Sequence, residues 1–203
     1  MTNQTRKSGT ERREEIAVAI LRIIGEQGLT SLTTATVAAE IGVSSGALFR
    51  HFASREEMLQ AAVEHALRKI EMTFPDKSLP PLERLLEMAR SRVRLLDANP
   101  GIAWLLKSDQ AYLELPAEAV QQLRGLAKRS RTVVLGAIRE GAAQGSIRND
   151  ISPEVLIVTV VGTIHALTGL SSTNRPSALR EAPDPEPVLA GLGLMLAASS
   201  QKI

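Results

Sequence analysis

The sequence predicts an all-α protein, in which an N-terminal three-helix domain with a helix-turn-helix precedes a C-terminal helical bundle, about nine helices in all. Three observations lead to this prediction. Apolar residues recur at helical spacing along most of the 203 residues, and no alternating strand pattern occurs. Aromatic residues make up only 2% of a chain that is 44% hydrophobic, so Leu, Ile, Val and Ala must fill the core, which favours helix packing.

The first helices are marked by caps and glycines. The isoleucines between Glu11 and Gly25 recur on one face and predict a first helix. The stretch Thr33–Phe52 then has the pattern of two short helices joined by a tight turn. Thr33 suits the cap of the first of these helices, and Gly42 suits its end.

The second short helix is capped by Ser44 or Ser45. Leu48 and Phe52 are four residues apart on it and should face the core. The other side chains then point outward. Two helices in this arrangement form a helix-turn-helix, whose second helix enters the major groove of DNA in many proteins.

A long helix follows, with Ser54 as its cap and Glu57 reaching back to complete a capping box. Three prolines and several turn formers in 75–81 end this helix. The helices expected after this break cover 81–99, 99–106, 116–141, 152–170 and 187–199. The fourth of them is apolar on nearly all sides, which predicts burial all round. We expect a long loop over 171–187.

This organisation predicts two domains, a helix-turn-helix domain over 1–54 with a flexible arm over 1–9, and a second domain over 55–203. The net charge is only +2, there is no cysteine, and the polar N-terminus lacks the apolar core of a secretory signal. Val155–Leu170, the longest apolar run, contains His165 and is too short to span a bilayer. We expect a soluble cytoplasmic protein that does not associate with membranes.

The block Leu32–Leu59 resembles the N-terminal domain of TetR/AcrR-type transcriptional regulators, in which Thr-x-x-x-Ile-Ala-x-x-Ala-Gly-Val-Ser-x-Gly-x-Leu-Tyr-x-Tyr-Phe is followed by Lys-Glu-x-Leu. The turn, the caps and the inward residues agree together. The resemblance implies that the first three helices bind DNA, that the helices after the fourth form a small-molecule pocket, and that the last two long helices pack against a partner subunit.

The outward face departs from the family pattern. Ser45 stands where the family often has Lys, and Phe49 where it has Tyr, so a phosphate contact through the tyrosine hydroxyl is lost. Arg50 suits either a phosphate or a guanine. Arg12, Arg13, Arg55 and Thr34, at the N-terminus of its helix, are expected to contact DNA phosphates, because cations and helix N-termini bind anions. The predicted DNA-binding residues are Arg12, Arg13, Thr33, Thr34, Ser44, Ser45, Gly46, Ala47, Phe49, Arg50, His51 and Arg55.

Residues of the second domain give weaker signals. The predicted ligand-binding residues are Met88, Trp104, Tyr112 and His165, for each of which a place in the core is the alternative. Small residues let helices approach closely, so the last two long helices are the predicted dimer interface, with packing inside one chain as the alternative. The residues named for it are Gly162, Ala166, Gly169, Gly191 and Leu194.

The sequence thus predicts a homodimeric transcriptional regulator of double-stranded operator DNA, a repressor released by a small-molecule effector. The alternative is a helical protein-interaction module without DNA affinity. Basic runs at 90–94 and 128–131 suit either a second nucleic-acid patch or solvated helix faces with nearby glutamates. No set of acids, nucleophiles or metal ligands has catalytic spacing, so we predict no enzyme activity, no metal and no cofactor.

Overall fold

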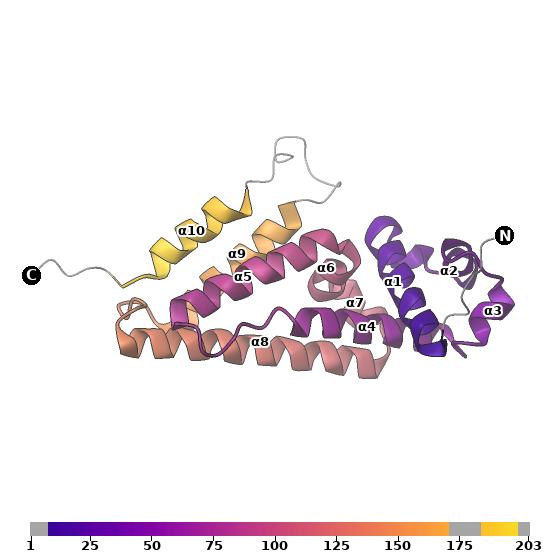
Figure 1. Cartoon of the computed structure of the whole chain (residues 1–203), viewed down its shortest axis with the longest axis horizontal. Helices are drawn as coiled ribbons and strands as arrows, with labels where there is room; N and C mark the ends of the chain where they lie inside the picture. The colour runs from indigo at the N-terminus through magenta and orange to yellow at the C-terminus, as the bar shows by residue number, and fades with distance from the viewer. Residues whose placement is uncertain (1–7, 171–183, 199–203) are drawn as a thin grey trace, which may run out of the picture. The chain divides into compact units, whose positions relative to one another are not determined.

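A computed structural model describes residues 8–170 and 184–198 of the chain. In these two ranges it forms ten α-helices, one short 3-10 helix and no strand, which confirms the all-α class (Figure 1). The elements in chain order are α1 (Gly9–Gln27), η1 (Leu29–Ser31), α2 (Thr34–Glu40), α3 (Ser45–Phe49), α4 (Arg55–Glu71), α5 (Pro81–Ala98), α6 (Pro100–Lys107), α7 (Asp109–Glu114), α8 (Ala117–Gln144), α9 (Pro153–Leu170) and α10 (Pro185–Leu196).

The chain divides into two compact units. The first contains Met1–Lys69 and Asn99–Arg124, and the second contains Ile70–Ala98 and Gly125–Ile203. Both α4 and α8 run from one unit into the other. These units do not correspond to the predicted domains over 1–54 and 55–203, which were defined by function. That functional division stays a prediction.

The core of the first unit is built on α1. Ser8 and Glu11 cap this helix reciprocally, since the Ser8 hydroxyl accepts from the Glu11 amide at 3.2 Å and the Glu11 carboxylate accepts from the Ser8 amide at 2.7 Å. Four isoleucines on one face of α1 are fully buried, as their spacing predicts. They are Ile16, Ile20, Ile23 and Ile24.

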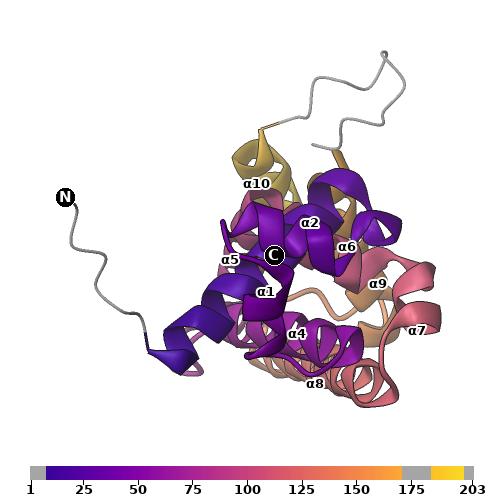
Figure 2. The same cartoon turned by 90° about the vertical axis from the view of Figure 1, so that its right-hand side faces the viewer.

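Two glycines bring the backbones of α1 and α6 into contact (Figures 1 and 2). A Cβ atom added at Gly101 would lie 1.9 Å from the carbonyl oxygen of Leu21, and one added at Gly25 would lie 2.5 Å from the Gly101 nitrogen. No side chain separates the helices at this point. The first turn of α6 is therefore held tightly against the helix that supports the helix-turn-helix.

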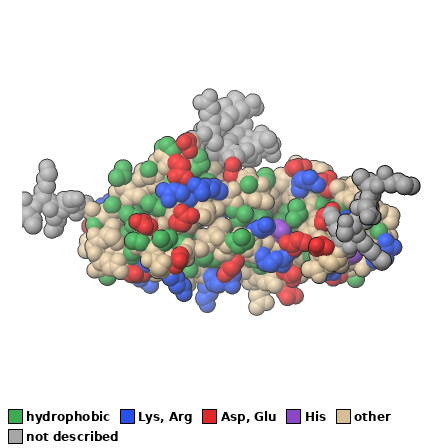
Figure 3. Space-filling view, in the orientation of Figure 1, with side chains coloured by type: hydrophobic (Ala, Val, Ile, Leu, Met, Phe, Trp, Pro, Cys, Tyr) green, Lys and Arg blue, Asp and Glu red, His purple; other side chains and the backbone are tan. Residues whose placement is uncertain are grey.

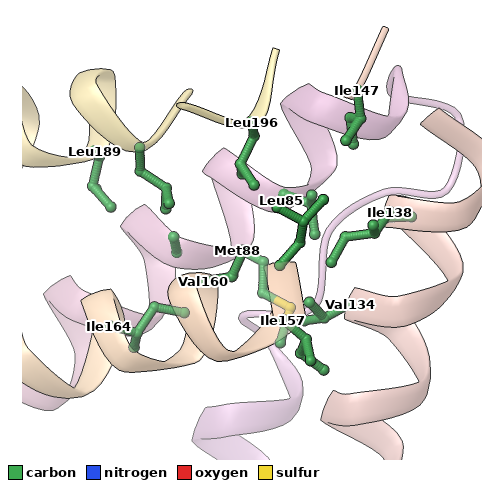
Figure 4. Packing of buried hydrophobic residues seen from close by; sticks show 14 of the residues in the cluster. Leu85, Met88, Val134, Ile138, Ile147, Ile157, Val160, Ile164, Leu189 and Leu196 are labelled. Atoms are coloured by element: carbon green, nitrogen blue, oxygen red, sulfur yellow. The ribbon is translucent and has the colours of Figure 1, made fainter. Parts of the chain in front are cut away.

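The second unit has its own core, made by α5, the second half of α8, α9 and α10 (Figure 4). Leu85 and Met88 of α5 occupy its centre, where α9 supplies Val160 and α10 supplies Leu196. The end of α10 is also fixed by main-chain hydrogen bonds, because the Arg148 amide donates to the Leu196 carbonyl at 2.8 Å.

Three details differ from the expectations. Ser108, in extended conformation, ends α6 and starts a separate helix α7, which the sequence analysis did not predict. Helix α10 covers Pro185–Leu196 instead of 187–199, since Asp184 caps it. Helix α9 is not buried all round in the single chain, because Val155 and Val158 are 56% and 68% exposed. The predicted arm over 1–9 and the predicted loop over 171–187 fall largely outside the described residues.

None of the helices in the described ranges combines the length and the apolar character that crossing a membrane requires.

Candidate nucleic-acid interface

The turn between α2 and α3 has the geometry that its sequence predicts. The Thr33 hydroxyl accepts from the Thr36 amide at 3.1 Å and so caps α2. Gly42 follows α2 with φ at +68°, a conformation that favours glycine, and the Val43 amide then donates to the Ala38 carbonyl at 2.9 Å. These contacts fix the angle at which α3 leaves the turn.

Helix α3 has one buried and one exposed face. The Ser44 hydroxyl caps it by accepting from the Ala47 amide at 3.2 Å. Leu48 within α3 and Phe52 just beyond its end are each 1% exposed, which confirms that both side chains face inward. The opposite side presents Ser45, Gly46, Phe49 and Arg50 to solvent, while Ala47 and His51 are half-buried.

Arg13 of α1 holds the end of α3 in place. Its guanidinium donates to the main-chain carbonyl of His51 and forms an ion pair with Glu57 at 2.9 Å. The same guanidinium lies 4.2 Å from the ring centroid of Phe52. Three contacts within the unit therefore engage this cation, and its predicted contact with DNA stays a prediction.

Glu57 completes the cap of α4. The Ser54 hydroxyl accepts from the Glu57 amide at 3.2 Å, and the Glu57 carboxylate accepts from the amide of Ala53 at 2.7 Å. The reciprocal bond of the predicted capping box thus goes to the residue before the cap. The Ala53 amide and the Arg13 guanidinium both stabilise the charged form and lower the pKa of Glu57.

The remaining cations differ in how strongly they are engaged. Arg12 pairs with Glu15 at 2.7 Å along α1, and the Arg55 side chain donates to the Leu32 carbonyl at 3.5 Å. The Arg50 side chain has no hydrogen bond or ion pair with any residue that the structure describes. Among these candidates, Arg50 is the cation that the fold leaves available.

Two family models match the sequence. One, described as bacterial regulatory proteins of the tetR family, matches residues 16–62 and includes the helix-turn-helix. The other, described as a Tetracyclin repressor-like C-terminal domain, matches residues 78–169. The chain belongs to the TetR family. It is a DNA-binding regulatory protein and not an enzyme.

The chain is also similar in sequence or in fold to several known proteins. The nucleoid occlusion factor SlmA of Vibrio campbellii is 27% identical over 160 residues, which cover 76% of this chain and 81% of that protein. The ketosteroid transcriptional regulator KstR2 of Mycobacterium tuberculosis has the same fold, with a TM-score of 0.74 at 19% identity over 98% of this chain and all of that one. AibR, solved with isovaleryl coenzyme A and operator DNA, has a TM-score of 0.74 at 18% identity over 92% of this chain and 98% of that one.

The predicted ligand-binding residues of this TetR-family chain are divided between the two units, with two in each. Met88 is buried in the core of the second unit, and His165 on α9 is exposed, which makes the core alternative wrong for His165 in the single chain. Trp104 and Tyr112 are half-buried in α6 and α7 of the first unit. Their role in ligand binding stays a prediction.

The second unit contains a cleft that the sequence analysis did not identify. It lies between the second half of α8 and the segment from the end of α4 to the start of α5, and its volume is about 570 Å³. Phe74, Pro75, Val133 and Ala137 form its apolar part. The volume falls within the range of small-molecule sites, ~300 to 1,000 Å³.

The predicted dimer residues lie partly on an exposed apolar face. Gly162 and Ala166 are exposed on α9, Leu194 is 81% exposed on α10, and Gly191 is half-buried. Gly169 belongs to α9, but its surroundings are outside the described residues. Hydrophobic side chains occur together with charged ones on the part of the surface where α10 lies (Figure 3).

Proposed function

We propose that this TetR-family chain is a cytoplasmic, homodimeric transcriptional regulator, a repressor that leaves its operator when a small-molecule effector binds the C-terminal bundle. The exposed face of α3 carries this proposal. It combines a cation whose side chain has no partner within residues 8–170 and 184–198, a glycine whose added Cβ atom would meet nothing within 4 Å, and an exposed aromatic ring, namely Arg50, Gly46 and Phe49.

The face suits DNA because each feature matches a part of the duplex. A guanidinium binds either phosphate or the acceptor edge of guanine, and a phenyl ring packs on a thymine methyl group. Gly46, in the first turn of α3, allows a close approach of the main chain to the backbone of DNA. Phosphate contacts from Arg12, Thr34 and Arg55 would position α3 in the groove, with Arg13 acting through the end of α3.

The size of α3 and an apolar face of the second unit support dimerisation. One short recognition helix covers few base pairs, whereas a two-fold pair contacts half-sites about 34–36 Å apart, or a multiple of that. Val155, Val158, Leu194 and Met195 are all more than half exposed on α9 and α10. Burying this face against a second copy would remove it from water.

Effector and operator must oppose each other in this proposal. Effector binding would favour a conformation in which α4 moves the two DNA-binding domains apart, so that their spacing no longer fits the operator. By linkage, operator DNA then weakens effector binding by the same factor, commonly worth ~1 to 3 kcal/mol. An effector that binds free and operator-bound protein equally well would refute this part.

DNA binding is tested by fluorescence anisotropy with promoter DNA of the neighbouring gene, at low and at physiological salt. Arg50→Ala should weaken binding; a smaller salt slope for all sequences indicates a phosphate contact, and lost preference at one base pair indicates a guanine. Gly46→Ala should weaken binding without loss of stability. Arg131→Ala, on α8, is the matched control. Absence of binding by the wild-type protein would favour the protein-interaction alternative.

The dimer is tested by sedimentation velocity. Val158→Glu and Leu194→Glu place a charge on the proposed interface and should produce monomers. Leu113→Glu is the control, since Leu113 is 83% exposed on α7, outside this face. A wild-type monomer at micromolar concentration, or dimers that survive both substitutions, would contradict the proposed interface.

A further inference from the structure

Charged side chains around the cleft of the second unit do not balance. Its lining includes four cations, Lys77, Arg84, Lys128 and Arg129, and two carboxylates, Glu71 and Glu140, an excess of two positive charges. Lys and Arg side chains gather along the edge where α8 lies (Figure 3).

Existing ion pairs engage only half of these cations. Arg129 pairs with Glu71 at 2.9 Å, and Arg84 pairs with Glu140. Lys77 and Lys128 are exposed and have no carboxylate partner among the residues of the described ranges. The two unpaired ammonium groups therefore give the cleft a positive potential.

Arg84 adds a donor at the wall of the cleft. Its side chain is 13% exposed, and its Nε–H is buried without a hydrogen-bond partner among the described residues. A buried donor that lacks an acceptor costs free energy, about 1 to 3 kcal/mol in general. An anionic oxygen that enters the cleft beside the Arg84–Glu140 pair would supply the acceptor.

A buried guanidinium lies next to Phe74, in the apolar part of the cleft. Arg92 of α5 is 7% exposed, its Cζ lies 5.5 Å from the ring centroid of Phe74, and its Nε donates to the Thr73 hydroxyl at 2.8 Å. One of its terminal nitrogens has no partner in the described part of the chain. Burial lowers the pKa of Arg92 to about 10, only partly offset by the charge of Glu71, so this cation stays charged at neutral pH.

The cleft also has room for an apolar body. Phe74 and Val133 face it, and Gly136 of α8 lines it with nothing within 4 Å of where a Cβ atom would be. A free inorganic ion would leave this apolar surface in contact with water. The occupant must therefore carry both a hydrophobic part and a negative group.

We propose that this cleft binds a small amphipathic anion, an alkyl or acyl chain that ends in a carboxylate or a phosphate. The chain lies against Phe74, Val133 and Gly136. The anionic group accepts a hydrogen bond from the Nε–H of Arg84, and the charges of Lys77 and Lys128 attract it into the cleft. That this anion is also the effector rests on the proposed function above.

Binding is measured by isothermal titration of the full chain with decanoate and with decyl phosphate, which separate the two possible headgroups. Decanol is the control with the same chain and no charge, and decyltrimethylammonium is the control with the same chain and a positive charge. We expect one of the two anions to bind at least about tenfold more tightly than decanol, and the cation not to bind. Equal binding of decanol and of both anions, or no binding of either anion at millimolar concentration, would overturn the proposal.

Two matched pairs of variants locate the site. Gly136→Leu fills the cleft and should abolish binding, whereas Gly125→Leu adds the same side chain to an exposed position of α8 outside the cleft. Lys77→Glu combined with Lys128→Glu should weaken anion binding roughly tenfold. Arg131→Glu, which changes one charge beside the cleft lining, should have little effect. Anion binding that Gly136→Leu leaves unchanged would refute this location.

Operator release is measured separately, by adding the bound anion to the complex of protein and promoter DNA. Titration tests the cleft without DNA, so its result does not depend on the proposed regulatory function. Binding without operator release would uphold the site and refute the assignment of the anion as effector. Failure of the protein to bind DNA would refute the regulatory function and leave the titration to decide the cleft.

Discussion

The contact between α1 and α6 depends on a glycine, and Gly101→Ala tests it. The added Cβ atom would lie 1.9 Å from the Leu21 carbonyl oxygen and 2.6 Å from its carbonyl carbon, both main-chain atoms of α1. Ordinary contact between such atoms begins near 3.4 Å. The two helices would have to separate by more than 1 Å, since no flexible side chain can rotate away.

The expected cost follows from this geometry. Overpacking a well-packed core costs typically ~1 to 3 kcal/mol, and a clash with main chain belongs at the upper end of that range. Gly101 lies in the first turn of α6, where the higher helix propensity of alanine offsets little. We therefore expect a loss of about 3 kcal/mol in the free energy of unfolding, or a fall of roughly 6 to 12 °C in Tm for a chain of this size.

Urea denaturation followed by circular dichroism measures this loss. Gly125→Ala is the matched control, because Gly125 is exposed on α8 and its added Cβ atom meets nothing within 4 Å. This variant should gain up to about 1 kcal/mol from helix propensity. A Gly101→Ala protein within about 0.5 kcal/mol of the wild type would show that the helices are not in main-chain contact, and would refute the reasoning.

Three further substitutions test other parts of the structure. Gly42→Ala forces a side chain into a left-handed conformation and should cost about 1 kcal/mol in urea denaturation, whereas Gly46→Ala should cost none. Burial would raise the pKa of Glu14, but the His65 hydrogen bond at 2.6 Å and the charges of His65 and Arg68 outweigh it and lower the pKa from 4.5. The stability that Glu14 adds is thus present above pH 4.5 and lost as pH falls through the lowered pKa, so the difference between wild type and Glu14→Gln should shrink on acidification; a constant difference would contradict this. Arg92→Met replaces an imperfectly paired buried cation and should change the free energy of unfolding by less than about 1 kcal/mol or raise it, whereas a loss of 3 to 5 kcal/mol, the cost of breaking a buried ion pair, would contradict this account.

The helix-turn-helix was predictable because its determinants are local. Thr33 and Ser44 cap the helix that follows each of them, Gly42 adopts the positive φ of the turn, and Leu48 and Phe52 share a helix face. Each of these features involves residues a few positions apart. Propensity, capping and periodicity therefore suffice to predict them.

Long-range pairs were not predictable from the sequence. Arg13 was expected to bind DNA because it is a cation near the helix-turn-helix, but its partners at His51 and Glu57 lie 38 and 44 residues away. His65 is buried against Glu14, 51 residues away. A pattern in the sequence places a charge on a helix face but does not identify what the neighbouring helix presents to it.

The cleft was not predictable for a related reason, because its charge depends on pairs between residues that are far apart in the sequence. Trp104 and Tyr112 are the only Trp and Tyr of the chain, and they were predicted to bind the ligand. The basic run that contains Lys128 and Arg129 was compatible with a solvated helix face, because glutamates occur nearby in the sequence. Contacts in the structure show which carboxylate each arginine of the cleft binds, with Glu71 bound to Arg129 and Glu140 to Arg84. Apart from these pairs, Lys77 and Lys128 remain as unpaired cations in the lining of a partly apolar cleft. These unpaired cations indicate that the ligand is an anion. Composition alone does not reveal them, because it does not show which charges are paired.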